Sequence, residues 1–310
     1  MILAIRNIFP NINVARFNVT AWQLPDSPNT ILVGREVVAP GIPGEPDIGT
    51  LVLVELDPEG NTIHERVIWE PKYESLYLED PRAFETTSGK IVIGLTALLR
   101  TKTDYEPFPA LVFVDQKWKE ELPPITLIQT FGSGKNLTPI GDNAYLFRPN
   151  AFEYHHQLLL FRLANGIPRK IKDIIFPTDI PWAKWRLGTT IPPLWLPSGE
   201  GILFIHGINH EADKYLYSIG VAKLTPQTDG GFTVKVHPDA LITPDTFIDG
   251  DGYSLVTELR PSERRVVYAC GGGVKRDQPG QIILYVNVGD KTTFEVMLDR
   301  LKLEAMVLAL

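Results

Sequence analysis

One acidic side chain is the first candidate for chemistry. Asp80 lies in the motif Glu79-Asp80-Pro81-Arg82, where the proline ring restricts the local backbone and so limits the directions of the carboxyl group. A carboxyl group held in this way could take part in a reaction. The alternative is a simple turn, in which the Asp80 carboxylate accepts backbone hydrogen bonds and Arg82 pairs at the surface.

Residues of cationic character end three short apolar segments, at Arg35, Arg148 and His206, and Lys135 adds a fourth such group. The chain as a whole is acidic, with 30 Lys and Arg against 37 Asp and Glu and a net charge of −7. A charged group in a narrow channel needs a partner or a ligand, and arginine and lysine are usual phosphate ligands. The cluster therefore predicts an anion site. The alternative is a channel filled by ion pairs with Asp and Glu.

Other side chains could complete such a site. Tyr217, eleven residues after His206, could offer its hydroxyl to the same anion, Trp185 could stack on a sugar, and Asp290 could close the site. Each of them could instead serve packing or a turn. Cys270 has no base partner in its surroundings, so a catalytic thiol is not expected.

The elements that must position these residues recur along the chain. Five short apolar strands start 60, 53, 58 and 64 residues apart, at 31–35, 91–96, 144–148, 202–206 and 266–270. A β-repeat of this length predicts an all-β fold, a five-bladed β-propeller, with residues 1–310 in a single domain. We expect these strands to be the innermost of their blades. The segment 300–310 could form a helix or a strand that closes the ring.

The segments that enter the innermost strands of a propeller meet at one mouth of its channel. Asp80, Lys135, Thr190 and Glu258 lie 11, 9, 12 and 8 residues ahead of their strands, so we expect them to converge. Arg82, Trp185, Thr190, Glu258 and Asp290 are the candidate substrate-binding residues.

The composition excludes several classes of function. No run of 18 apolar residues predicts a membrane span, and a net charge of −7 without a basic run argues against nucleic acid and anionic membranes as partners. The start of the chain does not resemble a secretory signal, and a single cysteine fits a reducing compartment, so we expect a cytoplasmic protein. The known nucleotide-binding and metal-binding motifs are not found, so no metal or other cofactor is expected. A homo-oligomer remains open.

Several motifs in order along the chain resemble glycoside hydrolase family 130, the β-mannoside phosphorylases and β-mannosidases. The matching segments are 79–82, 135–136, 145–149, 204–207, 215–220, 267–271 and 283–290. The resemblance implies a five-bladed propeller with Asp80 as the proton donor, acting through a hydroxyl of the mannose ring. It also implies a phosphate site made of Arg35, Lys135, Asn136, Arg148, His206 and Tyr217. The position of Lys135 is often arginine in that family, and lysine lacks the bidentate fork.

The chemistry favours phosphorolysis over hydrolysis. Phosphate already carries negative charge and needs only a positive site that directs it at the anomeric carbon. We therefore expect an inverting phosphorylase that uses inorganic phosphate as co-substrate and releases α-mannose 1-phosphate and an acceptor sugar. An inverting hydrolase would need a second carboxylate to activate water, for which Glu258 and Asp290 are candidates. A sugar-binding propeller without catalysis is the third reading.

Overall fold

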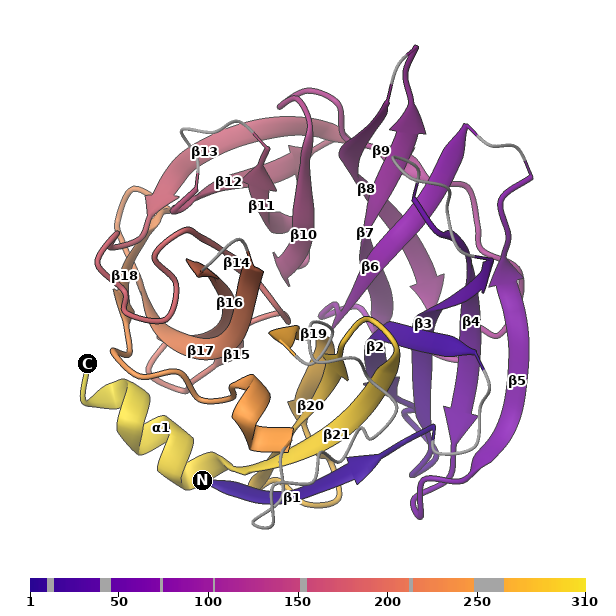
Figure 1. Ribbon diagram of the computed structural model, residues 1–310. Coiled ribbons are helices and arrows are strands. Elements are labelled where there is room, and N and C mark those ends of the chain that lie inside the picture. Colours follow the sequence, from indigo (N-terminus) through magenta and orange to yellow (C-terminus); the bar gives the residue numbers. More distant parts are fainter. Residues whose placement is uncertain are drawn as a thin grey trace.

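The computed structural model describes residues 1–9, 14–39, 46–72, 75–102, 104–150, 155–211, 214–247 and 265–310. The described residues form five antiparallel sheets around a common axis (Figure 1). The predicted five-bladed β-propeller is confirmed.

Four blades follow one another along the chain, and each runs from the axis outward. Blade one contains β2 (Ala15–Gln23), β3 (Thr30–Ala39), β4 (Ile48–Leu56) and β5 (Thr62–Trp69). Blade two contains β6 (Leu76–Glu85), β7 (Lys90–Arg100), β8 (Tyr105–Asp115) and β9 (Thr126–Leu127). Blade three contains β10 (Gly134–Gly141), β11 (Ala144–Pro149), β12 (Gln157–Ala164) and β13 (Ile167–Ile175). Blade four contains β14 (Arg186–Thr189), β16 (Gly201–Glu211), β17 (Lys214–Pro226) and β18 (Phe232–Val236), with β15 (Leu194–Trp195) also paired to β16.

Blade five joins the two ends of the chain. It contains β19 (Val267–Val274), β20 (Gln281–Val288), β21 (Thr292–Asp299) and, as its outer strand, β1 (Ile2–Asn7). The pairing of β1 with β21 places Ile5 opposite Val296. The ring is therefore closed by the N-terminal strand. Of the two alternatives expected for segment 300–310, a helix and a closing strand, the structure shows the helix α1 (Arg300–Leu308).

The recurring apolar strands occupy a different place from the one predicted. In Figure 1 the strands nearest the axis are β2, β6, β10, β14 and β19. Segments 31–35, 91–96, 144–148 and 202–206 fall in β3, β7, β11 and β16, which are the second strands of their blades. Only the fifth segment, in β19, is innermost. The second strands are apolar because a neighbouring blade covers each of their faces, whereas the innermost strands carry the polar side chains of the channel.

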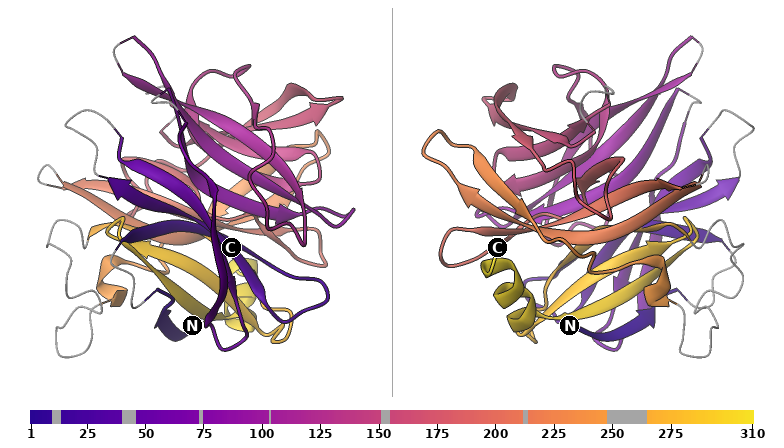
Figure 2. Two further views of the ribbon diagram at one scale, coloured as in Figure 1. Left: turned by 90° about the vertical axis from the view of Figure 1, so that its right-hand side faces the viewer. Right: turned by 60° about the vertical axis from the view of Figure 1, so that its left-hand side comes forward.

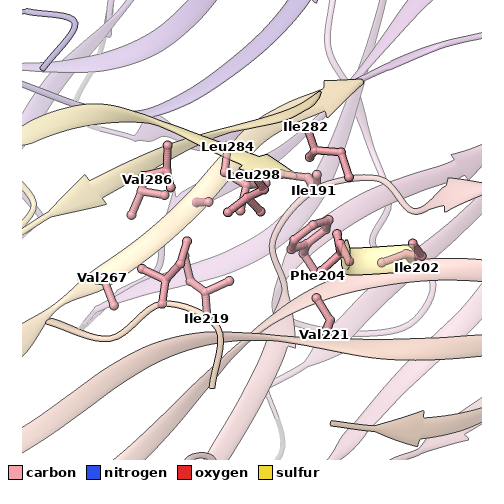
Figure 3. Packing of buried hydrophobic residues seen from close by; sticks show 14 of the residues in the cluster. Ile191, Ile202, Phe204, Ile219, Val221, Val267, Ile282, Leu284, Val286 and Leu298 are labelled. Carbon is pink, nitrogen blue, oxygen red and sulfur yellow. The ribbon is translucent and has the colours of Figure 1, made fainter. Parts of the chain in front are cut away.

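The core lies between the blades. Five clusters of buried apolar side chains occupy the five interfaces between neighbouring sheets in the described part of the chain. Figure 3 shows the interface of blades four and five, where Phe204 and Ile219 face Val267 and Leu284. Each blade buries both faces against its neighbours, so the ring as a whole is the stable unit.

The helix α1 covers the outer side of the same interface. It packs Leu303 and Val307 against the cluster of blades four and five, on the outside of the ring (Figure 2). Its N-cap is Asp299, whose side chain accepts a hydrogen bond from the backbone N–H of Lys302. No helix in the described ranges is long and apolar enough to cross a membrane.

Candidate active site

One pocket, of about 460 Å³, collects polar side chains from all five blades. The sequence-predicted residues that line it are Arg35, Asp80, Lys135, Asn136, Arg148, Trp185, His206, Tyr217 and Asp290. Asp80 therefore shares one pocket with Arg148 and His206. Arg82 and Thr190 do not line this pocket, and Glu258 lies outside the described residues.

A repeated backbone distortion directs three of these side chains. Asn18, Asp80 and Asn136 have φ angles of 54°, 54° and 62°, in the left-handed region that non-glycine residues rarely adopt. Each lies at a register shift of an innermost strand, in β2, β6 and β10. For Asp80 the following Pro81 restricts the backbone further. Non-glycine residues held at positive φ concentrate at functional sites.

A buried carboxylate already pairs with two of the predicted phosphate ligands. Glu79 Oε1 lies 2.9 Å from Arg35 Nη1, and its Oε2 accepts a hydrogen bond of 3.2 Å from Lys135 Nζ. Burial acts against the charged form of Glu79, but Lys135 and Arg35 outweigh it and keep the pKa of Glu79 below its ordinary value. The alternative prediction, that carboxylates neutralise the cations of the channel, is therefore correct for Arg35 and Lys135.

Two arginines of the pocket, Arg148 and Arg186, are not neutralised in this way. Arg148 and Arg186 form no salt bridge with any residue in the described ranges, and the Nε atom of each is buried without a hydrogen-bond partner. Burial, followed by the nearby Arg186, lowers the pKa of Arg148 to about 10. The buried guanidinium group of Arg148 beside the half-buried Arg186, with no carboxylate paired to either in the described ranges, is unfavourable unless an anion binds there. Nothing in the local sequence distinguishes Arg186 from a surface arginine, so it was not among the predicted residues, although Trp185 and Thr190 of the same segment were.

His206 and Tyr217 complete this side of the pocket. Their rings stack with centroids 6.3 Å apart. Burial, with the neighbouring Arg148 and Arg82, lowers the pKa of His206 well below its ordinary value, so the ring is neutral at pH 7. Burial raises the pKa of Tyr217, which keeps its hydroxyl protonated and able to donate a hydrogen bond.

Gly188 makes room for this arrangement. A Cβ atom at Gly188 would lie 2.2 Å from Asn136 Nδ2 and 2.7 Å from His206 Cε1. Only glycine at this point of β14 therefore allows Asn136 and His206 to meet, with 3.4 Å between Asn136 Nδ2 and His206 Nε2.

Arg82 is fully buried and lies behind the residues that line the pocket. Its guanidinium donates to the backbone oxygens of Thr190 (2.9 Å) and Asp80 (2.8 Å), to Asn136 Oδ1 (3.1 Å) and to the Tyr268 hydroxyl. The predicted role of Arg82 and Thr190 in contacting substrate does not fit this geometry. They fix the backbone of Asp80 and the side chain of Asn136, because an interior position leaves arginine only protein acceptors to bind.

Aromatic side chains form the rim of the pocket. The Trp185 ring lies 4.9 Å from the Tyr215 ring and 5.3 Å from the His155 ring, with Arg186 over its face at 5.4 Å. Tyr215 is 47% exposed, so part of this rim is open to a ligand. A half-open aromatic surface beside a polar pocket suits the apolar face of a pyranose ring.

We expect Trp185→Ala to raise the KM for a β-mannobiose about tenfold, equivalent to about 1.4 kcal/mol of lost binding. The KM for methyl β-mannoside, which has no second ring, should change little. Steady-state kinetics with both substrates test this. Trp195→Ala is the matched control, because Trp195 is 37% exposed and lies outside the pocket. An equal rise of KM for both substrates would contradict an acceptor-stacking role.

Asp290 brings a third carboxyl group to the pocket. It is an exposed residue of the turn after β20, and it lines the pocket. Desolvation by the surrounding protein, and then the nearby Asp80 carboxylate, raise the pKa of Asp290 to about 6. Asp290 therefore changes charge in the physiological range.

We expect the affinity for sulfate, an anion that does not titrate in this range, to fall about threefold to tenfold as pH rises through about 6. The reason is that Asp290 becomes negative above its pKa of about 6 and repels the bound anion. Calorimetric titrations between about pH 5 and about pH 7.5 measure this, and Asp290→Asn should show a flat profile. A slope that survives in Asp290→Asn would assign the titration to another group.

The structure bears on two further kinds of site, a catalytic thiol and a metal site. Burial raises the pKa of the Cys270 thiol to about 12, which makes it a poor nucleophile. Across the described part of the chain, no group of three His, Cys, Asp or Glu side chains is placed to hold a metal ion.

The fold is shared with solved structures of mannoside-active enzymes. A β-1,2-mannobiose phosphorylase from Listeria innocua, in complex with β-1,2-mannobiose, superposes with a TM-score of 0.72 at 12% identity, covering 99% of this chain and 100% of the other. MPT-4, a mannose phosphorylase from Leishmania mexicana in complex with phosphate ion, gives 0.57 at 14% identity over 92% and 84% of the two chains.

A third structure connects the fold with both reactions considered above. It comes from work stating that the GH130 family of mannoside phosphorylases contains glycoside hydrolases that target β-1,2 mannosidic linkages in Candida mannan. It superposes with a TM-score of 0.60 at 14% identity over 92% of this chain and 84% of the other. No family model and no curated protein sequence matches the chain. The resemblance to glycoside hydrolase family 130 is confirmed for the fold, which this chain shares with mannoside phosphorylases of that family along nearly its whole length.

Proposed function

We propose that the protein is an inverting β-mannoside phosphorylase. The observation that carries the proposal is the buried guanidinium group of Arg148 beside the half-buried Arg186, neither of them in a salt bridge within the described ranges, in the same pocket as Asp80. Inorganic phosphate between these groups, with hydrogen bonds from Tyr217, would have the charge and the position to attack the anomeric carbon. The structural likeness to phosphorylases that act on mannosides supports mannose as the sugar that is transferred.

In the proposed reaction a phosphate oxygen forms the new bond to the anomeric carbon while the bond from that carbon to the glycosidic oxygen breaks. The proton of Asp80 passes through a hydroxyl of the mannose ring to the leaving oxygen, which becomes a hydroxyl of the acceptor sugar. Asp80 then regains a proton from solvent. Attack from the face opposite the leaving group gives α-mannose 1-phosphate.

Hydrolysis is the second candidate, and the salt bridges of Glu79 favour it. Because Glu79 occupies Arg35 and Lys135, phosphate has fewer free cations than the sequence suggested. Glu79 and Asp290 are also carboxylates of the same pocket, and either could activate a water molecule.

Incubation of the protein with β-1,2-mannobiose and other β-mannosides, with and without phosphate, separates the candidates. Phosphorus and proton NMR should detect α-mannose 1-phosphate, and only when phosphate is present. Free mannose formed at a rate indifferent to phosphate would instead establish a hydrolase. Saturable sugar binding without any product would indicate a sugar-binding propeller.

A further inference from the structure

A chain of buried hydrogen bonds from blade five ends on the carboxyl group of Asp80. The Thr293 hydroxyl lies 3.0 Å from Asn287 Oδ1, Asn287 Nδ2 donates to Asn18 Oδ1 at 2.8 Å, and Asn18 Nδ2 donates to Asp80 Oδ1 at 2.5 Å. The four side chains come from β21, β20, β2 and β6, and none is more than 7% exposed. This series of hydrogen bonds therefore crosses three blades.

The chemistry of the groups sets the direction of this chain. A carboxylate only accepts hydrogen bonds, so Asn18 must turn its NH₂ group toward Asp80 and its oxygen toward Asn287. Asn287 must then donate to Asn18, and its own oxygen is left to accept from the Thr293 hydroxyl. Each amide is fixed by the one before it, so neither can flip without leaving a buried polar group unpaired.

We propose that Asn18 and Asn287 are positioning residues that determine which oxygen of Asp80 carries the transferable proton. Asn18 occupies Oδ1, and the left-handed backbone of both Asn18 and Asp80 brings the two side chains together. When Asp80 carries the proton, its Oδ1 atom still accepts from Asn18, so the proton resides on Oδ2 in one orientation. This inference rests on the proposed role of Asp80 as the acid.

Asn287 allows the positioning role to be separated from substrate contact. It is fully buried and does not line the pocket, so it does not contact the substrate, and its side-chain hydrogen bonds reach Asp80 through Asn18. A misdirected proton donor slows the departure of a poor leaving group such as a sugar hydroxyl. It has little effect on an activated aryl leaving group, which departs without a proton.

The test compares Asn287→Leu and Asn18→Gly with the wild type on β-1,2-mannobiose and on 4-nitrophenyl β-mannoside. We expect kcat on the mannobiose to fall about 10-fold to 100-fold, with the aryl mannoside and the KM for phosphate nearly unchanged. Asn18→Gly keeps the left-handed backbone, since glycine adopts it freely. Asn165→Gly is its matched control, because Asn165 has φ of 52° in an exposed hairpin turn away from the pocket.

Equal losses on both substrates, or no loss on either, would overturn the positioning role while leaving the phosphorylase intact. A wild type that turns over neither substrate would refute the proposed function instead. Crystal structures of the wild type and Asn287→Leu then decide the inference without reference to activity. A changed direction of the Asp80 carboxyl group supports it, and an unchanged direction overturns it.

Discussion

Replacing Asp80 by asparagine is expected to lower kcat for phosphorolysis of β-1,2-mannobiose by about 10²-fold to 10⁴-fold, the usual contribution of a general acid. Asparagine has nearly the same shape and tolerates the φ of 54° observed at this position, so the fold should remain intact. What is removed is the proton that the leaving oxygen needs. Rates of α-mannose 1-phosphate formation, with circular dichroism spectra of both proteins, measure the effect.

Asp115→Asn is the control for the Asp80 variant. Asp115 is an exposed residue at the end of β8 and does not line the pocket, so activity should be unchanged. If Asp80→Asn kept full activity on β-1,2-mannobiose, another group would have to be the acid. Normal binding of the mannoside by an inactive Asp80→Asn would place the defect in the chemical step.

Arg148→Met should impair phosphate use and stabilise the protein at the same time. Loss of one charged donor from an anion site is expected to lower kcat/KM for phosphate about 10²-fold to 10³-fold. Burial and Arg186 lower the pKa of Arg148 from its ordinary value to about 10. The charged side chain therefore destabilises the folded state at every pH below that value, by up to about 3 kcal/mol. Methionine fills a similar volume without that penalty, so the free energy of unfolding should rise.

Urea denaturation in phosphate-free buffer measures the stability change, and Arg35→Met provides the control of opposite sign. Arg35 neutralises Glu79 at 2.9 Å, so its removal leaves a buried carboxylate with Lys135 alone and should destabilise the fold. Added phosphate should then stabilise the wild type more than Arg148→Met, because a ligand stabilises the state that binds it. If Arg148→Met were less stable than the wild type, Arg148 would have a structural partner and the anion site would lie elsewhere.

The fold could be predicted because its signal is local and repeated. Apolar strands of similar length return at nearly even spacing, and only a ring of sheets uses such a repeat through the whole chain. The position of each strand within its blade could not be predicted. The polar channel strands, such as the four-residue β14, carry a weaker pattern than the apolar strands behind them. Distance from the axis is not a property of local sequence.

The site, too, could be predicted only in part. Asp80, Arg148, His206 and Tyr217 could be selected from their residue types and the family resemblance, and they do meet in one pocket. Glu79 was not among the predicted site residues, and in a regular strand it would point to the face opposite Asp80. The register shift between Glu79 and Arg82 brings both Glu79 and Asp80 into the pocket. Such a shift in strand register cannot be predicted from the local sequence.

The way the ring closes has a consequence during synthesis. Strand β1 completes blade five only by pairing with β21, almost the full length of the chain later, so it leaves the ribosome long before its partner exists. Until then β1 has an unpaired edge, and the apolar faces of blades one and four that later pack against blade five stay exposed, so the growing chain is prone to aggregation. The amide pair of Asn287 and Asn18 joins blade five to blade one. A truncated product lacking its final blade would therefore lack the support for its acid as well as the closure of its ring, and no partly made molecule should turn over sugar.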